Sequence, residues 1–208
     1  MRNLRSALFL LIMLMLCTGL AYPLLTTELA QRLFPAQANG SLIYRDNIVV
    51  GSSLIGQAFN QDNYFHGRPS ATADTPYNAL ASGGSNLAAS NPALDTQIRQ
   101  RVAQWRRSTN SPLPIPADLL TASGSGLDPA ISPEAARYQA ARIAQVRGIA
   151  LPRVQQLISR FTQTSTPAFI GRPTVNVLML NLALDREKKT AQIRKHHDYW
   201  RRSSSGSR

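Results

Sequence analysis

The sequence predicts an α+β protein with one N-terminal transmembrane helix, followed by a single compact extracytoplasmic domain with short strands and about three helices. Three observations support this fold class. An uncharged run of 22 residues, 6–27, lies near the N-terminus. Two short apolar runs flank a turn signal near residue 46, and three later segments carry apolar residues at helical spacing. Short strands that precede a separate group of helices are typical of the α+β class.

The apolar run is long enough to cross a bilayer. About 20 helical residues span the roughly 30 Å of hydrocarbon. Arg2 and Arg5 precede the run, and the positive-inside rule then places the N-terminus in the cytoplasm and the remaining chain outside. We therefore expect a basic cytoplasmic N-terminus at 1–5, an uncleaved transmembrane helix at 6–26 and an extracytoplasmic domain at 27–185.

Two other readings of the N-terminal segment compete with an uncleaved span. A cleaved signal peptide has a similar basic start and apolar stretch, and Gly19-Leu20-Ala21 could serve as its cleavage site. A lipoprotein anchor at Cys17 fits less well, because the bulky Leu16 stands where a small residue is expected. The length of the run favours the uncleaved span.

The sequence of the first half of the domain predicts a hairpin followed by a long loop. The runs SLIY and IVV flank Arg45-Asp46-Asn47, which predicts a hairpin with a three-residue turn. Residues 60–91 then show no apolar period and are rich in Gly, Ser, Asn and Pro. Because the segment also holds Tyr64, Phe65 and Tyr77, we expect an ordered, functional loop and not a disordered tract.

Helices dominate the second half. A helix from Pro92 carries Leu94, Ile98, Val102 and Trp105 on one face, and a short helix at 26–34 ends at Pro35. Further helices are expected from Ser132-Pro133 to Val146, with Gly148 as the stop, and at 151–161. The last apolar run, VNVLMLNLALD, predicts a strand that leads into a helix.

Composition and motifs exclude several classes of function. A single cysteine leaves no disulfide framework and no CxxC-type site, and three histidines, of which two adjoin in the tail, predict no metal site. There is no P-loop, GxGxxG, GxSxG or HExxH motif. The motif search therefore marks no catalytic residue on this chain.

The positive charge is concentrated at the C-terminus. Eight Lys/Arg against two Asp/Glu give residues 186–208 a charge of +6, half of the chain's +12. The body is only mildly basic, so we expect no nucleic-acid partner. The tail is expected to be a flexible, solvated extension, with anionic lipid headgroups as the other reading.

Two glycine-containing loops and one aromatic segment hold the candidate site residues. The first loop could let backbone amides approach an anion or a partner chain, and it comprises Ser82, Gly83, Gly84, Ser85 and Asn86. The other candidates for partner docking are Phe65, His66, Arg68, Ser123, Gly124, Ser125, Gly126 and Asp128. The plainer expectation is that both loops are tight turns, that His66 is a hydrogen-bonded loop residue, and that Arg68 binds a carboxylate or a carbonyl.

Seven segments occur in a characteristic order along the chain. They are YPLL at 22–25, FPAQANGSL at 34–42, GSSLIGQ at 51–57, YFHGRPSA at 64–71, SGGSNL at 82–87, TASGSGLD at 121–128 and NLALD at 181–185. Over about residues 5–185, this ordered series resembles the C subunit of the Kdp-type potassium-transporting P-type ATPase (the KdpC family).

The resemblance implies a single-pass inner-membrane subunit that is not itself catalytic. Its partners would be a channel-like potassium-binding subunit, which handles the potassium, the P-type ATP-hydrolysing subunit and a small membrane subunit. The family is described as a catalytic chaperone that raises the ATP affinity of the hydrolysing subunit. ATP is the one cofactor implied, and the loop at 82–85 resembles the signature loop of ABC ATPases, although Ser85 stands where that loop has Gln.

The topology conflicts with direct ATP contact, because an outside loop cannot reach nucleotide held in the cytoplasm. We therefore expect the 82–86 loop to dock on a partner subunit and to affect ATP at a distance. The alternative function is a membrane-anchored or secreted serine hydrolase that uses Ser85 or Ser123. A serine-directed fluorophosphonate probe and co-purification with membrane partners distinguish the two.

Overall fold

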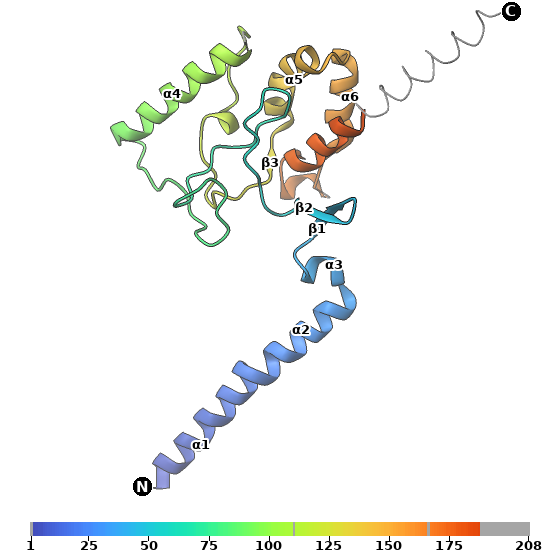
Figure 1. Ribbon diagram of the computed structural model, residues 1–208. Coiled ribbons are helices and arrows are strands. Elements are labelled where there is room, and N and C mark those ends of the chain that lie inside the picture. Colours follow the sequence, from blue (N-terminus) through green and yellow to red (C-terminus); the bar gives the residue numbers. More distant parts are fainter. Residues whose placement is uncertain (1, 110, 166, 188–208) are drawn as a thin grey trace, which may run out of the picture. The chain divides into compact units, whose positions relative to one another are not determined.

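The computed structural model describes residues 2–109, 111–165 and 167–187 (Figure 1). The chain divides into two compact units, Met1–Ser52 and Ser53–Arg208. The mixture of helices with short strands confirms the predicted fold class. The basic tail predicted at 186–208 lies outside the described residues from position 188 onward.

The first unit begins with a helix that is continuous from Asn3 to Leu33. It consists of α1 (Arg2–Leu16), a π-helical turn (Cys17–Ala21) and α2 (Tyr22–Leu33). Its 31 residues are long and apolar enough to cross a membrane, and none of its most apolar window is buried within the protein. A short helix, α3 (Pro35–Ala38), follows the expected break at Pro35.

A two-stranded antiparallel hairpin ends this unit, with strands β1 (Leu42–Arg45) and β2 (Ile48–Ser52). Arg45 pairs with Ile48, so the turn holds two residues and the prediction of a three-residue turn was wrong. Asp46 and Asn47 have φ angles of 52° and 63°. Their short polar side chains tolerate this left-handed conformation, which a tight two-residue hairpin turn requires.

Within its described residues, the second unit holds four α-helices and a three-stranded antiparallel sheet. The helices are α4 (Pro92–Thr109), α5 (Pro133–Arg147), α6 (Leu151–Phe161) and a helix at 177–187. The central strand β5 (Thr174–Asn176) pairs with β3 (Ala130–Ile131) and β4 (Thr162–Gln163). Single 3₁₀ turns lie at Ala117–Leu119 and Ala168–Ile170. The passage from β5 directly into the last helix confirms the prediction for the final apolar run.

The start and stop signals of α5 act as expected. The Ser132 hydroxyl accepts a hydrogen bond from the Ala135 amide at 3.2 Å, which satisfies one of the free donors of the first turn. Gly148 ends the helix in the left-handed conformation, with φ at 63°.

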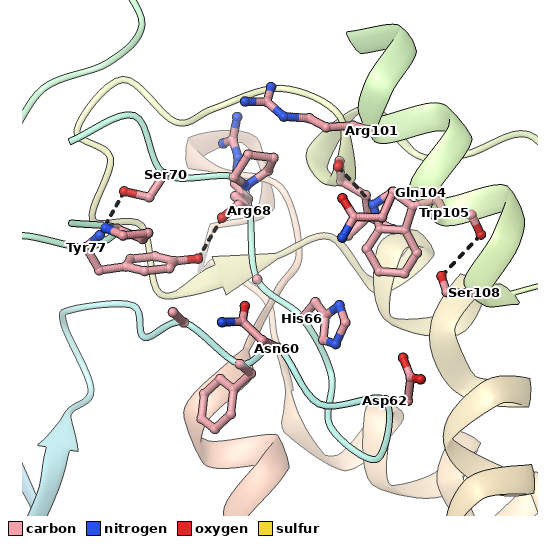
Figure 2. A pocket seen from close by; sticks show the side chains of 16 residues that line it. Asn60, Asp62, His66, Arg68, Ser70, Tyr77, Arg101, Gln104, Trp105 and Ser108 are labelled. Atoms are coloured by element: carbon pink, nitrogen blue, oxygen red, sulfur yellow. Dashed lines mark hydrogen bonds between the residues drawn. The ribbon is translucent and has the colours of Figure 1, made fainter. Parts of the chain in front are cut away.

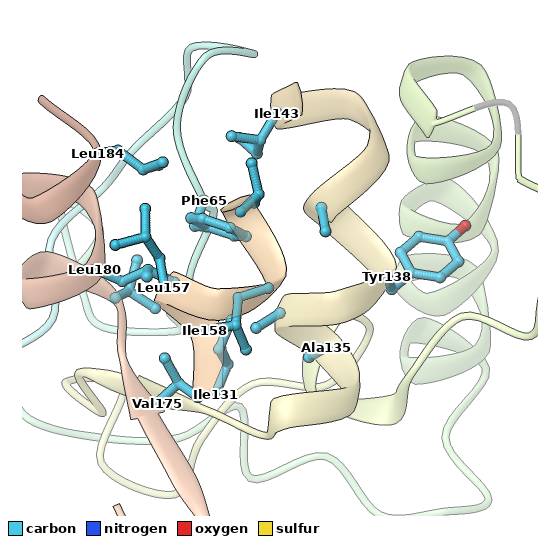
Figure 3. Close-up of a cluster of buried hydrophobic side chains, with 14 of the residues drawn as sticks. Phe65, Ile131, Ala135, Tyr138, Ile143, Leu157, Ile158, Val175, Leu180 and Leu184 are labelled. Carbon is cyan, nitrogen blue, oxygen red and sulfur yellow. The ribbon is translucent and has the colours of Figure 1, made fainter. Parts of the chain in front are cut away.

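The hydrophobic core of this unit lies between α5, α6, the helix at 177–187 and the small sheet (Figure 3). Phe65 lies inside it and is fully buried, although it comes from the long loop. The apolar stripe predicted on α4 contributes only Trp105 to the core, because Leu94, Ile98 and Val102 stay half-exposed. The core therefore fixes one point of the long loop, and the rest is held by polar contacts.

Candidate functional site

The two glycine-containing loops, separate in the sequence, pack against each other. The Gly83 amide and the Ser82 hydroxyl both donate to the Ser125 carbonyl oxygen, at 2.9 Å and 3.1 Å. The Gly83 carbonyl in turn lies so close to Gly126 that a Cβ atom there would be 2.6 Å from its oxygen. The two loops thus form one unit, which we call the paired loops (82–86 and 122–128).

The glycines of the paired loops have different surroundings. A Cβ atom on Gly84 would lie 3.1 Å from the Gly124 carbonyl oxygen, so the second loop occupies that side. Gly83 and Gly124 have nothing within 4 Å of such an atom. Room for the close approach of another molecule therefore exists at Gly83 and Gly124 and is filled at Gly84 and Gly126.

Arg68 and Ser70 join the paired loops to the segment 68–77. The Arg68 guanidinium donates to the Asp128 carboxylate and to the Ala122 carbonyl, both at 3.3 Å. The Ser70 hydroxyl donates to the Gly126 carbonyl at 2.8 Å. The expectation that Arg68 binds a carboxylate or a carbonyl is confirmed, since it binds one of each.

Tyr77 closes this segment from the other side. Its hydroxyl donates to the Arg68 carbonyl at 2.6 Å, and its ring covers Gly56 and Gly67, where a Cβ atom would collide with it. Burial, together with the nearby Asp128 charge, raises the pKa of the Tyr77 hydroxyl to about 12. Tyr77 is therefore protonated at neutral pH and acts as a donor.

Phe65 and His66 are held by two buried amide side chains that pair with the backbone as a neighbouring strand would. Asn181 accepts from the Phe65 amide at 2.9 Å and donates to the Phe65 carbonyl at 3.0 Å. Gln139 does the same for His66, at 2.8 Å and 3.0 Å. Both amides are buried, and the loop receives from them the hydrogen bonds that it lacks.

Two arginines of α5 hold the preceding turn of the loop. Arg142 donates to the carbonyls of Asp62 and Tyr64, and Arg147 donates to the Asn63 carbonyl. Arg147 also forms an ion pair with Asp185 at 3.0 Å, and its guanidinium lies 4.7 Å from the centre of the Tyr64 ring. No specific signal in the sequence marks these arginines or Gln139, because such residues are common on exposed helix faces.

A pocket of about 300 Å³ opens between the segment 58–77 and α4 (Figure 2). Its polar lining includes Asn60, Asp62, His66, Arg68 and Arg101. Burial lowers the pKa of His66, and the Arg142 charge lowers it further. His66 is therefore neutral at pH 7, and its ring Nε2 lies 3.1 Å from the Gln61 carbonyl oxygen, which confirms a hydrogen-bonded loop residue.

The structure brings only part of the candidate set together. Ser82, Gly83, Gly84, Ser123, Gly124, Ser125, Gly126, Arg68 and Asp128 lie in or against the paired loops. Ser85 and Asn86 follow in the same loop, and Asn86 adopts a φ of 50°. Phe65 is part of the core and presents no side-chain surface to a partner, whereas His66 lines the pocket.

The geometry does not assemble a serine hydrolase. In the described residues no hydrogen bond joins His66 to Ser85 or Ser123, and Ser123 is itself buried. The same part of the chain contains no group of three or more His, Cys, Asp or Glu side chains that could hold a metal ion. The site is therefore a set of polar loops beside a pocket, without a recognisable catalytic arrangement.

Comparison with known proteins identifies the family. A family model described as "K+-transporting ATPase, c chain" matches residues 4–186. A potassium-transporting ATPase KdpC subunit of Pectobacterium atrosepticum is 73% identical over 90% of this chain and 98% of its own length. Proteins of the same name from Serratia proteamaculans and Yersinia pseudotuberculosis are 59% and 60% identical, over 90% and 89% of this chain and 100% and 93% of their own lengths. The chain belongs to the KdpC family, as the ordered motifs indicated.

Proposed function

We propose that this chain is a non-catalytic accessory subunit of an ATP-driven potassium import pump. The observation that carries the proposal is the family match, which runs through both the apolar helix and the domain. Its partners would be the channel-like potassium-binding subunit, the P-type ATP-hydrolysing subunit and a small membrane subunit. Its own contribution would be to stabilise the complex and to raise the ATP affinity of the hydrolysing subunit.

The proposed topology is a single pass through the inner membrane, with the domain outside the cytoplasm. Arg2 and Arg5 at the start of the chain support a cytoplasmic N-terminus. The exposed side chains of the helix support a segment that lies in lipid or against partner helices, because no other described part of the chain covers its apolar window.

The ATP effect is proposed to be indirect. A phosphate-binding loop offers several free backbone amides that point at the anion. In the 82–86 loop the Gly83 amide and the Ser82 hydroxyl are already bonded to the Ser125 carbonyl. This arrangement favours docking of the loop on a partner, which would shift the pump toward the state that binds ATP more tightly.

Two measurements on the full chain test this proposal. The chain purified alone in detergent should show no saturable binding of ATP, and the assembled pump should lose apparent potassium affinity or stability when Gly83 is replaced with Ala. Gly83→Ala is the suitable variant because it adds a methyl group in open space and disturbs no internal contact. Saturable ATP binding by the isolated chain that Gly83→Ala abolishes would overturn the indirect role.

A further inference from the structure

The pocket beside the 58–77 segment has two arginines along one short stretch of backbone. Arg101, from α4, donates to the Leu120 carbonyl at 2.7 Å, and Arg68 donates to the Ala122 carbonyl at 3.3 Å. Two residues of extended chain span roughly 7 Å. The two guanidinium groups therefore bind the same short stretch of backbone, and both arginines line the pocket (Figure 2).

The charges around these arginines do not cancel. Arg68 has the Asp128 carboxylate at 3.3 Å. Asp62, the acidic residue of the lining, lies 3.8 Å from the buried Arg142. Among the described residues, Arg101 has no carboxylate within ion-pair distance; its guanidinium contacts only the Leu120 carbonyl and the Gln97 side chain. The pocket therefore holds one positive charge that no acidic side chain balances.

The lining also offers hydrogen-bond donors that the protein does not use. The Arg68 Nε is buried without a hydrogen-bond partner among the described residues. The exposed side-chain amides of Asn60 and Gln104 also line the pocket and can donate to a group bound there. A buried donor without a partner costs about 1–3 kcal/mol, so an acceptor that enters here would relieve that cost.

We propose that this pocket binds an oxyanion, a carboxylate or phosphate group, between Arg101 and Arg68. Guanidinium groups match the planar, multiple acceptors of such groups, and a volume of about 300 Å³ is at the lower end of sites for small ligands. The group comes either from a free small anion or from an acidic side chain of a partner subunit. The second source rests on the proposed function, and the first does not.

The first arm of the experiment titrates inorganic phosphate, and separately succinate, into the full chain in detergent at constant ionic strength. Wild type should bind at least one of them saturably, and Arg101→Gln should weaken that binding about tenfold or more. Arg99→Gln is the matched control, because it removes the same charge from the same helix. Arg99 is exposed, is paired with Asp95 at 2.8 Å and does not line the pocket.

The second arm purifies the assembled pump with each variant. If the anion is a partner's side chain, free anions bind weakly, and Arg101→Gln but not Arg99→Gln reduces recovery of the partner subunits. Arg101→Lys keeps the charge and should restore part of either effect, which separates a binding role from a loss of folding. Equal behaviour of Arg101→Gln and Arg99→Gln in both arms overturns the inference, as does free-anion binding that never saturates combined with unchanged recovery of the partner subunits from Arg101→Gln.

Discussion

Replacing Gly126 with Ala should destabilise the domain, whereas the same change at Gly83 should not. Gly126 has a φ of 68°, a conformation that costs an L-residue about 1–2 kcal/mol. The new methyl carbon would lie 2.6 Å from the Gly83 carbonyl oxygen and 2.6 Å from Thr72 Cγ2, so the paired loops must separate. Loss of the Gly83 to Ser125 hydrogen bond adds about 0.5–1.5 kcal/mol.

The expected loss for Gly126→Ala is therefore about 2–3 kcal/mol of unfolding free energy. Gly83→Ala meets nothing within 4 Å and should range from neutral to a gain of about 0.5–1 kcal/mol. Urea unfolding of the full chain in detergent measures both, followed by the fluorescence of the buried Trp105. The packing argument is refuted if Gly126→Ala stays within about 0.5 kcal/mol of wild type, or if Gly83→Ala is equally harmful.

Four further predictions follow from the other contacts. Because the pKa of His66 is lowered in the folded protein, the unfolded chain takes up a proton at His66 before the folded chain does as the pH falls. The free energy of unfolding should therefore decrease as the pH drops below about 6.5. His66→Gln should lack that decrease when urea unfolding is measured at pH 7.5 and 5. Asn181→Leu leaves the buried Phe65 amide and carbonyl unpaired and should cost about 2–4 kcal/mol of unfolding free energy. The exposed Gln145→Leu should change that free energy by less than about 0.5 kcal/mol. Equal losses would exclude a stabilising role for the pairing of Asn181 with Phe65. Exchange of 6–26 for an unrelated apolar span should preserve membrane insertion and reduce co-purification of the pump subunits; unchanged recovery would show that the domain alone holds the complex. A reporter enzyme that works only in the cytoplasm should be inactive when fused after Asp185, and activity there would contradict the topology.

The elements with strong local signals could be predicted from the sequence. The ends of α5 followed from Ser132 and Gly148. The continuous helix was predicted as two adjoining pieces, a span at 6–26 from the uncharged run and a short helix at 26–34 that ends at Pro35. The two-residue strands β3 and β4 were not predicted, because they are too short for an alternating pattern to show. The hairpin was predicted with the wrong turn length, since Arg45 can belong to the turn or to the strand until its partner is known.

The candidate site was predicted as separate pieces and not as an arrangement. Glycine and serine content marked both paired loops, but their contact depends on hydrogen bonds between residues more than 40 positions apart, which no local pattern encodes. Asn181 did carry a signal, a single amide within the apolar run LMLNLALD. An amide in that position is either exposed or fully hydrogen-bonded, and here it serves Phe65.

The pairing of the Gln139 and Asn181 side chains with the loop backbone also determines the order in which the domain can form. The ribosome makes residues 61–66 long before Gln139 and Asn181, which supply their hydrogen bonds. The loop has no regular structure of its own between Ser53 and Asn91, and a nascent chain that ends before α5 lacks the side-chain amides that hold Phe65 and His66. Contacts across 73 and 116 residues carry a large loop-closure cost, which places them late in folding. The stretch around Phe65 and His66, which forms one side of the pocket, is thus fixed in full only when the last helix has been synthesised.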